Sequence, residues 1–224
     1  MILIGLTGSI GMGKSTAATA LRRLGLPIHD ADAAVHRLLA PGGGAVRPVL
    51  AAFPDVASAA GGIDRQRLGA RVFGDPTALK RLEAILHPRV RAAKRQFLAA
   101  QARRRRRLVV LDVPLLFETG GERECDAVLV VSAPAFLQRQ RVLGRPGMSE
   151  AKFRAILAKQ MPDREKRRRA QHAAPPGHVV PTGLGQRFSL NHLRAALRAI
   201  EQYETTGPHR LRGRGRSASM RPER

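Results

Sequence analysis

The stretch Gly8-Ser9-Ile10-Gly11-Met12-Gly13-Lys14-Ser15 decides the fold. It fits the pattern G-x-x-x-x-G-K-[ST] at every fixed position. A short apolar run, Ile2–Thr7, comes before it, and Lys14–Leu24 after it carries apolar residues at helical spacing. A buried strand, a glycine-rich turn and a helix are the context that this pattern requires. We therefore predict a phosphate-binding loop for a nucleoside triphosphate.

Each fixed position of the loop has a physical role. Glycines let the backbone N–H groups approach phosphate oxygens closely, and the following helix adds the positive end of its dipole. We expect Lys14 to reach the β- and γ-phosphates, Ser15 to ligand Mg²⁺ and Thr16 to hydrogen-bond the α-phosphate. The predicted nucleotide-binding residues of the loop are Gly8, Gly11, Met12, Gly13, Lys14, Ser15 and Thr16.

Short apolar runs alternate with helical segments along the rest of the chain. Strands separated by helices favour a parallel sheet with helices on both faces. We predict an α/β fold of the three-layer P-loop type, with a parallel five-stranded sheet. The predicted strands after the first are Leu26–His29, Leu108–Val113, Ala127–Val131 and Val179-Val180.

The domain prediction is a single domain over residues 1–206. Its core is expected at about 2–40, 108–144 and 179–204. Residues 45–101 carry a helical pattern without a confident strand, which predicts a substrate-binding insertion. Within it, Pro88 should end or kink a helix just after His87. Residues 207–224 hold six arginines against one acid and are predicted to be a disordered basic tail.

The formal net charge of +23 in 224 residues predicts anionic partners. Part of this charge lies in the tail and in the block Arg103–Arg107. A nucleic-acid-binding NTPase is therefore one alternative. Seven Phe, one Tyr and no Trp leave few aromatic platforms for base stacking, and no zinc spacing occurs. We expect no specific nucleic acid partner.

Other bulk features concern location. No apolar run approaches the ~20 residues that span a bilayer, and the N-terminus enters the first strand without a basic leader. The single cysteine, Cys125, excludes an intramolecular disulfide, fits a reducing cytoplasm and is interpreted as an unreactive thiol. We expect a cytoplasmic monomer without a membrane span.

Asp30-Ala31-Asp32 follows the predicted second strand, beside the phosphate loop. A kinase that phosphorylates an alcohol needs a carboxylate to orient or deprotonate the hydroxyl, and acids here could also help to hold magnesium. An acid at a strand end can instead cap the next helix. The sequence alone leaves both interpretations open.

Several stretches occur together in one order across roughly residues 2–200. Their ordered sum resembles the dephospho-coenzyme A kinase family. The resemblance implies transfer of a phosphoryl group from ATP, with Mg²⁺, to the ribose 3′-hydroxyl of dephospho-coenzyme A, which gives coenzyme A and ADP. The stretches are Gly5–Thr16, Asp30-Ala31-Asp32, Val72-Phe73, Leu86-His87-Pro88, Val113–Glu118, Gln160-Met161 and Val180-Pro181-Thr182-Gly183.

The resemblance also implies roles for individual residues. Asp32 would be the catalytic base, and Asp112 a possible acidic partner of the magnesium shell. A helical lid is expected at about 145–170, where arginines would close over ATP and neutralise charge on the moving phosphoryl group. The implied catalytic residues are Asp32, Lys14, Arg141 and Arg145, with Arg167 a further lid candidate; Arg145, Thr182 and Gly183 would contact ATP; and Asp32, His87, Arg91, Leu116, Phe117 and Glu118 would contact dephospho-coenzyme A.

The sequence departs from the family pattern in three places. Pro146-Gly147 follows Arg145 where the family commonly has an acid, and Ala170-Gln171 stands where Ala-Asp is usual. The stretch Gln171–His178 is also longer than expected and is interpreted as a surface loop. A different small-molecule P-loop kinase, acting on a nucleoside or nucleoside monophosphate, remains an alternative.

Overall fold

The computed structural model describes residues 1–172 and 177–206. Within these ranges the strands form a five-stranded parallel sheet in the order β2-β3-β1-β4-β5. This confirms the predicted sheet, while the predicted tail at 207–224 lies outside the described residues. The stretch Gln171–His178 differs from the surface loop that was expected: Gln171 and His172 belong to a helix, Gly177 and His178 belong to a strand, and residues 173–176 lie outside the described residues. The strands are β1 (Ile2–Thr7), β2 (Ile28–Asp30), β3 (Leu108–Asp112), β4 (Ala127–Ser132) and β5 (Gly177–Pro181).

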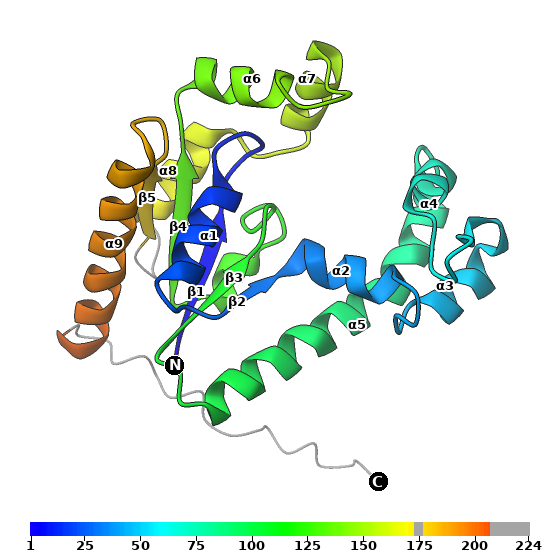
Figure 1. The fold of residues 1–224 in the computed structure, drawn as a ribbon, viewed down its shortest axis with the longest axis horizontal. Coiled ribbons are helices and arrows are strands. Elements are labelled where there is room, and N and C mark those ends of the chain that lie inside the picture. Colours follow the sequence, from blue (N-terminus) through cyan, green and yellow to red (C-terminus); the bar gives the residue numbers. More distant parts are fainter. Residues whose placement is uncertain (173–176, 207–224) are drawn as a thin grey trace, which may run out of the picture.

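Helices connect and flank these strands (Figure 1). None of them, in the described ranges, combines the length and the apolar character that a membrane crossing requires. They are α1 (Lys14–Arg23), α2 (Ala31–Leu39), α3 (Val46–Ala52), η1 (Pro54–Val56), α4 (Arg65–Val72), α5 (Pro76–Arg103), η2 (Gly121–Glu124), α6 (Ala135–Leu143), α7 (Glu150–Ala158), α8 (Asp163–His172) and α9 (Gln186–Thr206).

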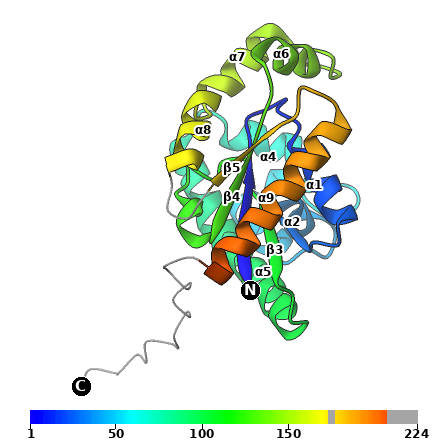
Figure 2. The same ribbon diagram turned by 90° about the vertical axis from the view of Figure 1, so that its left-hand side faces the viewer.

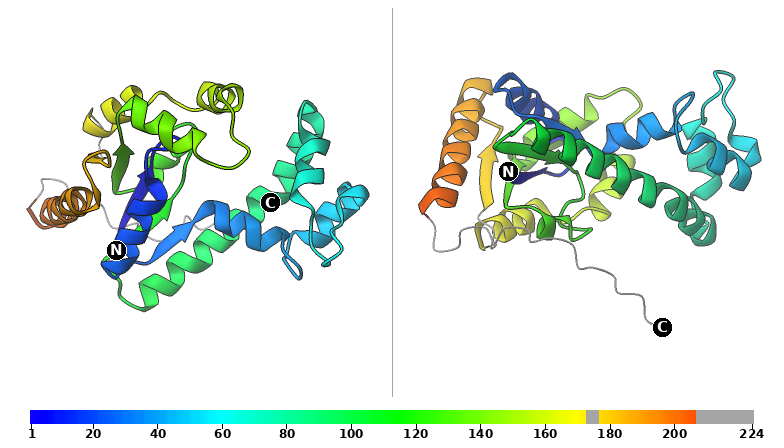
Figure 3. Two further views of the ribbon diagram at one scale, coloured as in Figure 1. Left: turned by 45° about the horizontal axis from the view of Figure 1, so that its top comes forward. Right: turned by 90° about the horizontal axis from the view of Figure 1, so that it is seen from below.

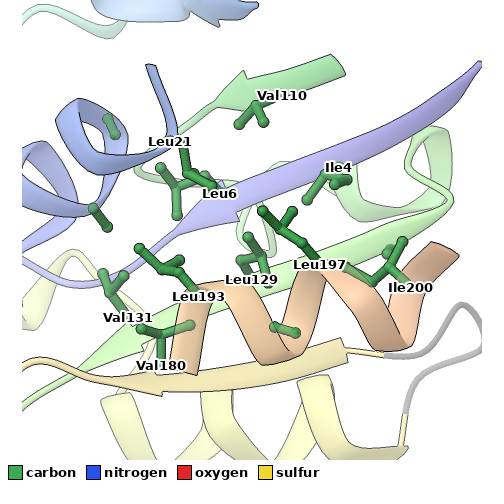
Figure 4. Close-up of a cluster of buried hydrophobic side chains, with 14 of the residues drawn as sticks. Ile4, Leu6, Leu21, Val110, Leu129, Val131, Val180, Leu193, Leu197 and Ile200 are labelled. Carbon is green, nitrogen blue, oxygen red and sulfur yellow. The ribbon is translucent and has the colours of Figure 1, made fainter. Parts of the chain in front are cut away.

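The sheet has helices on both faces because its strands are apolar on both sides. Side chains alternate along β1, so Ile4 and Leu6 face α1 and α9, whereas Leu3 faces the opposite layer. Figure 4 shows Leu193 and Leu197 of α9 directed into the first of these layers. Figure 2 shows α9 lying across β4 and β5, with α8 to one side.

The insertion has a separate apolar cluster. Leu39, Val49, Phe53, Leu68 and Leu82 are buried together, from α2, α3, the turn that follows it, α4 and α5. Figure 1 shows this insertion projecting away from the sheet. In Figure 3, α2 and α5 run side by side from the sheet towards α3 and α4. Asp64 and Asp75 cap α4 and α5 by accepting backbone N–H groups of their first turns.

The helix that was expected to end or kink just after His87 does not end there, because α5 continues through Pro88 to Arg103. Proline removes a backbone N–H and crowds the preceding turn. The next residue, Arg89, ties this part of the helix to the segment before α3: its guanidinium donates to the Ile85 carbonyl at 2.7 Å and to the Gly44 carbonyl at 3.0 Å. Packing of the flanking helix against α2, α3 and α4 also favours one continuous element.

The predicted lid range covers two different environments. Figure 1 shows α6 and α7 above the carboxyl ends of the strands, whereas α8 packs against β4 and β5. Lys166 and Ala170 of α8 are fully buried. This buried face is not evident from the sequence of α8, because the helix is very basic and its other cationic side chains are exposed. The part of the range that extends from the sheet is therefore the part before α8.

Candidate functional site

The glycine-rich loop leaves the carboxyl end of β1, at the centre of the sheet, and enters α1. Gly11 and Gly13 have φ angles of 78° and 88°, which disfavour any residue with a Cβ. A Cβ at Gly8 would also lie 2.3 Å from Val131, and one at Gly13 would lie 3.0 Å from Thr182. Glycine is thus required here by the backbone and by the neighbouring side chains.

Ser15 and Thr16 stand in the first turn of α1, and both are exposed. The N-cap residue Gly13 offers no side-chain acceptor to this helix start. Ser15 and Thr16 are therefore accessible to an anionic ligand at the N-terminal end of α1.

Side chains from distant segments hold the tip of the loop. Gln138 donates to the Ile10 carbonyl at 2.7 Å, and the Ile10 N–H donates to Gln160 Oε1 at 3.0 Å. The Ser9 hydroxyl donates to the Met161 carbonyl at 3.4 Å. Neither glutamine was singled out as a functional residue from the sequence, although Gln160 belongs to one of the family stretches. These bonds restrict the loop before any ligand binds.

Arg141 joins the loop to the segment after β5. Its guanidinium donates to the Gly11 carbonyl at 3.4 Å and to the Thr182 carbonyl at 2.7 Å. The Thr182 hydroxyl in turn donates to the Met12 carbonyl at 2.6 Å. Arg141 is therefore engaged by the protein itself, in contact with the back of the loop. Sequence reasoning expected a freer side chain.

The other two lid arginines have different surroundings. Arg145 is exposed at the end of α6. Arg167 forms an ion pair with Asp163, with 3.0 Å between Nε and Oδ2. The Ser132 hydroxyl donates to the same carboxylate oxygen at 2.8 Å. Arg167 is thus held by Asp163 with 48% of its side chain exposed.

A cavity of about 510 Å³ opens beside the loop, at the carboxyl ends of β4 and β5. Met12 and Gly183, which were predicted to contact nucleotide, are both part of its wall. The remaining lining residues are Ser132, Ala133, Pro134, Ala135, Gln138, Asp163, Arg167, Val179, Pro181 and Leu184.

Three acids lie near the loop in different roles. Lys14 Nζ is 2.6 Å from Asp112 Oδ1, and the Asp112 side chain is only 4% exposed. Strand register pairs Asp112 of β3 with Asp30 of β2. Asp30 accepts the Ala33 N–H at 2.9 Å and so caps α2. Asp32 is exposed in the first turn of α2. The cap alternative is thus confirmed for Asp30, which leaves Asp32 outside the cap.

Burial raises the pKa of Asp112 above its ordinary value of 3.8, against the hydrogen bond and charge of Lys14. The folded state then binds this proton more tightly than the unfolded state, so Asp112 costs stability at pH 7 and costs nothing below pH 3.8. We expect Asp112→Asn to raise the melting temperature at pH 7 by about 2–4 °C. Calorimetry at a series of pH values should show the gain shrinking towards pH 4. A variant less stable than the wild type at pH 7 would contradict this.

The predicted acceptor residues separate into two groups. His87 and Arg91 are exposed on α5, four residues apart and hence on one face of the helix. Leu116 and Phe117 are 1% and 4% exposed in the core cluster behind β1 and β3. Both side chains pack in the core, and the contact of these two residues with the substrate stays a prediction.

Glu118 also has a protein partner. Its carboxylate lies 2.9 Å from Lys166 Nζ and accepts the Met161 N–H at 2.8 Å. Burial acts to raise the pKa of Glu118, but these hydrogen bonds outweigh it and hold the pKa below its usual range. Sequence reasoning missed Lys166 because it lies within a run of exposed basic residues.

Comparisons with known proteins agree with this geometry. A family model described as "Dephospho-CoA kinase" matches residues 2–174. The chain is 68% identical over 167 residues to a dephospho-CoA kinase of Paramagnetospirillum magneticum. The matched residues cover 75% of this chain and 78% of the relative. It is 61% identical over 196 residues to that of Rhodospirillum rubrum, covering 88% and 90%.

Solved structures show the same fold. Protein TT1252 from Thermus thermophilus superposes with a TM-score of 0.74 at 38% identity, covering 92% of this chain and 98% of that one. A dephospho-CoA kinase from Campylobacter jejuni has a TM-score of 0.61 at 22% identity, covering 88% and 96%. The second similarity concerns the fold alone.

Proposed function

Because the chain belongs to the dephospho-CoA kinase family, it transfers a phosphoryl group from ATP to dephospho-CoA, and we propose that Asp32 is the base for this transfer. One observation carries the assignment. Of the three acids at the strand ends, Asp30 caps α2 and Asp112 pairs with Lys14, whereas Asp32 is exposed. Asp32 would accept the proton of the ribose 3′-hydroxyl as that oxygen attacks the γ-phosphorus.

The glycine-rich loop would hold the triphosphate of ATP. Its backbone N–H groups and the start of α1 suit phosphate oxygens, and Thr16 is exposed for the α-phosphate. Lys14 would leave Asp112 and bind the β- and γ-phosphates when ATP is present. Arg141 and Thr182 would keep the loop in shape from behind.

The residues present fit a magnesium ion. The Ser15 hydroxyl and the carboxylates of Asp30 and Asp112 are hard oxygen donors, which Mg²⁺ prefers, directly or through water. When bound, the ion would neutralise charge on the phosphate oxygens. Asp112 would supply one of the carboxylates for the ion once Lys14 binds the phosphates.

The insertion and the arm formed by α6 and α7 would surround the acceptor and the nucleotide. His87 and Arg91 present polar and cationic groups on one face of α5, suited to the phosphates of dephospho-CoA. Arg145 is exposed and would approach the transferring phosphoryl group when the arm closes. Gly183, in the wall of the cavity beside the loop, would contact the nucleotide.

Location and assembly are further proposals. The single cysteine supports a reducing compartment, the cytoplasm. Cys125 is buried, and burial raises its pKa to about 12, which supports the interpretation as an unreactive thiol. We propose a monomer, because each of the proposed site residues is supplied by the same chain.

Acceptor selectivity tests the proposed function. With ATP and Mg²⁺, we expect turnover of dephospho-CoA to exceed that of adenosine, cytidine and shikimate by at least about 10³-fold in kcat/KM. Coupled detection of ADP gives the rates, and mass spectrometry of the product confirms phosphorylation at the ribose. Comparable rates with a nucleoside would favour the other small-molecule kinase.

A further inference from the structure

Lys166 is a fully buried lysine outside the set of predicted site residues. Its side chain is 0% exposed, on the face of α8 that packs against β4 and β5. A lysine without partners in such a place would lose its proton or destabilise the fold. Here Nζ lies 2.9 Å from Glu118 Oε1 and 3.2 Å from the Pro114 carbonyl. The interior thus holds one ion pair between α8 and the loop after β3.

This ion pair continues to the glycine-rich loop through the segment between α7 and α8. Glu118 accepts the Met161 N–H at 2.8 Å. The neighbouring Gln160 accepts the Ile10 N–H at 3.0 Å, and the Met161 carbonyl accepts the Ser9 hydroxyl at 3.4 Å. Segment 160–161 is therefore hydrogen-bonded on one side to the buried pair and on the other side to the phosphate loop.

A second route starts from the same lysine. The Pro114 carbonyl accepts hydrogen bonds from both Lys166 and the Thr7 hydroxyl, at 3.2 and 3.0 Å. Thr7 is the last residue of β1, directly before Gly8. The buried pair is thus linked to both sides of the loop: through the Pro114 carbonyl to the end of β1, and through segment 160–161 to the tip of the loop.

We propose that Lys166 is a positioning residue for the phosphoryl transfer. Through Glu118 it anchors segment 160–161, which holds the Ser9 and Ile10 backbone in the conformation that binds the triphosphate. Because segment 160–161 also ends the α6–α7 arm, the same anchor determines where the arm rests relative to the nucleotide. The inference rests on the nucleotide role proposed for the loop and assigns no contact between Lys166 and ATP itself.

Steady-state kinetics of Lys166→Met test this inference. The substitution keeps an unbranched side chain of similar length and removes the pair. We expect KM for ATP to rise about 10–100-fold, because small displacements of a binding group cost that much. KM for dephospho-CoA should stay within about twofold, since the acceptor residues lie on α5. Isothermal titration with ADP should show the same loss, independently of turnover.

Lys94→Met is the matched control. Lys94 also pairs with a glutamate, Glu124, but 24% of its side chain is exposed and it lies on α5. This variant should keep the KM for ATP of the wild type. Equal losses in the two lysine variants would show that general destabilisation, not the anchor, is responsible, and would overturn the proposal.

A double-mutant cycle with Gln160→Ala tests the route. If Lys166 acts through segment 160–161, the two losses should not add up. The dissociation constant of the double variant for ADP should then be at most about twofold higher than that of the weaker-binding single variant. Losses that multiply would overturn the route. Circular dichroism checks folding; should Lys166→Met not fold, the cycle is repeated with Glu118→Gln, which retains the shape of the side chain. A folded Glu118→Gln variant with normal ADP affinity would then overturn the proposal.

Discussion

Asp32→Asn is expected to lower kcat by about 10²–10⁴-fold while leaving the dissociation constant for ATP within about twofold. The reason is that a neutral amide cannot accept the proton of the attacking hydroxyl. The exposed position of Asp32 in the first turn of α2 makes an effect on folding small. Single-turnover measurements at saturating substrates, with nucleotide binding measured separately, distinguish the loss of chemistry from the loss of binding.

Asp30→Asn is the control for this variant. Asparagine caps helices as well as aspartate does, so the bond to the Ala33 N–H should survive while the charge is removed. We expect a smaller loss of kcat than for Asp32→Asn. The reverse order would transfer the role of base to Asp30, and full activity of Asp32→Asn would exclude Asp32.

Lys14→Ala is expected to reduce kcat/KM for ATP by about 10³-fold, because it removes a charged donor from the β- and γ-phosphates. Asp112 would lose its hydrogen-bonded cation and stay buried, so the stability of the variant is measured beside its activity. A normal thermal unfolding curve together with lost turnover would therefore locate the defect in the reaction.

Lys94→Ala is a suitable control, because it also removes a lysine that pairs with a carboxylate, at 24% exposure and away from the loop. It should keep wild-type kcat/KM. If Lys14→Ala retained more than a tenth of the activity, Lys14 would be a structural partner of Asp112 and not a phosphate ligand.

The sequence predicted the core elements well for local physical reasons. Apolar runs produced the strands, and Asp64 and Asp75 at helix starts produced the caps. The phosphate loop could be predicted because its backbone adopts positive φ angles, which favour glycine at fixed positions of the sequence. The family relationship and the kinase function, inferred from ordered short stretches, are confirmed by the comparisons.

Features that depend on tertiary contacts were harder to predict. Pro88 stays inside α5 because the helix packs against α2, α3 and α4 around it. In the sequence, Lys166 is one basic residue in a run of exposed basic residues. Only the folded structure places it in the interior, paired with Glu118. Leu116 and Phe117 stand in a family stretch, and nothing in their sequence spacing distinguishes a wall of the core from a wall of a pocket. The individual roles of His87, Arg91 and Arg145 stay predictions.

The length of α5 has a mechanical consequence. This helix packs at one end in the insertion, beside α2, α3 and α4, and at the other continues into β3. At 28 residues it spans about 42 Å. Phe97 and Leu98 pack its last part against the core behind the sheet, so a rotation of about 10° about that contact would move the far end of the helix by about 6 Å. Small adjustments where the helix joins the sheet could thus be amplified into opening and closing of the acceptor side, with His87 and Arg91 travelling along.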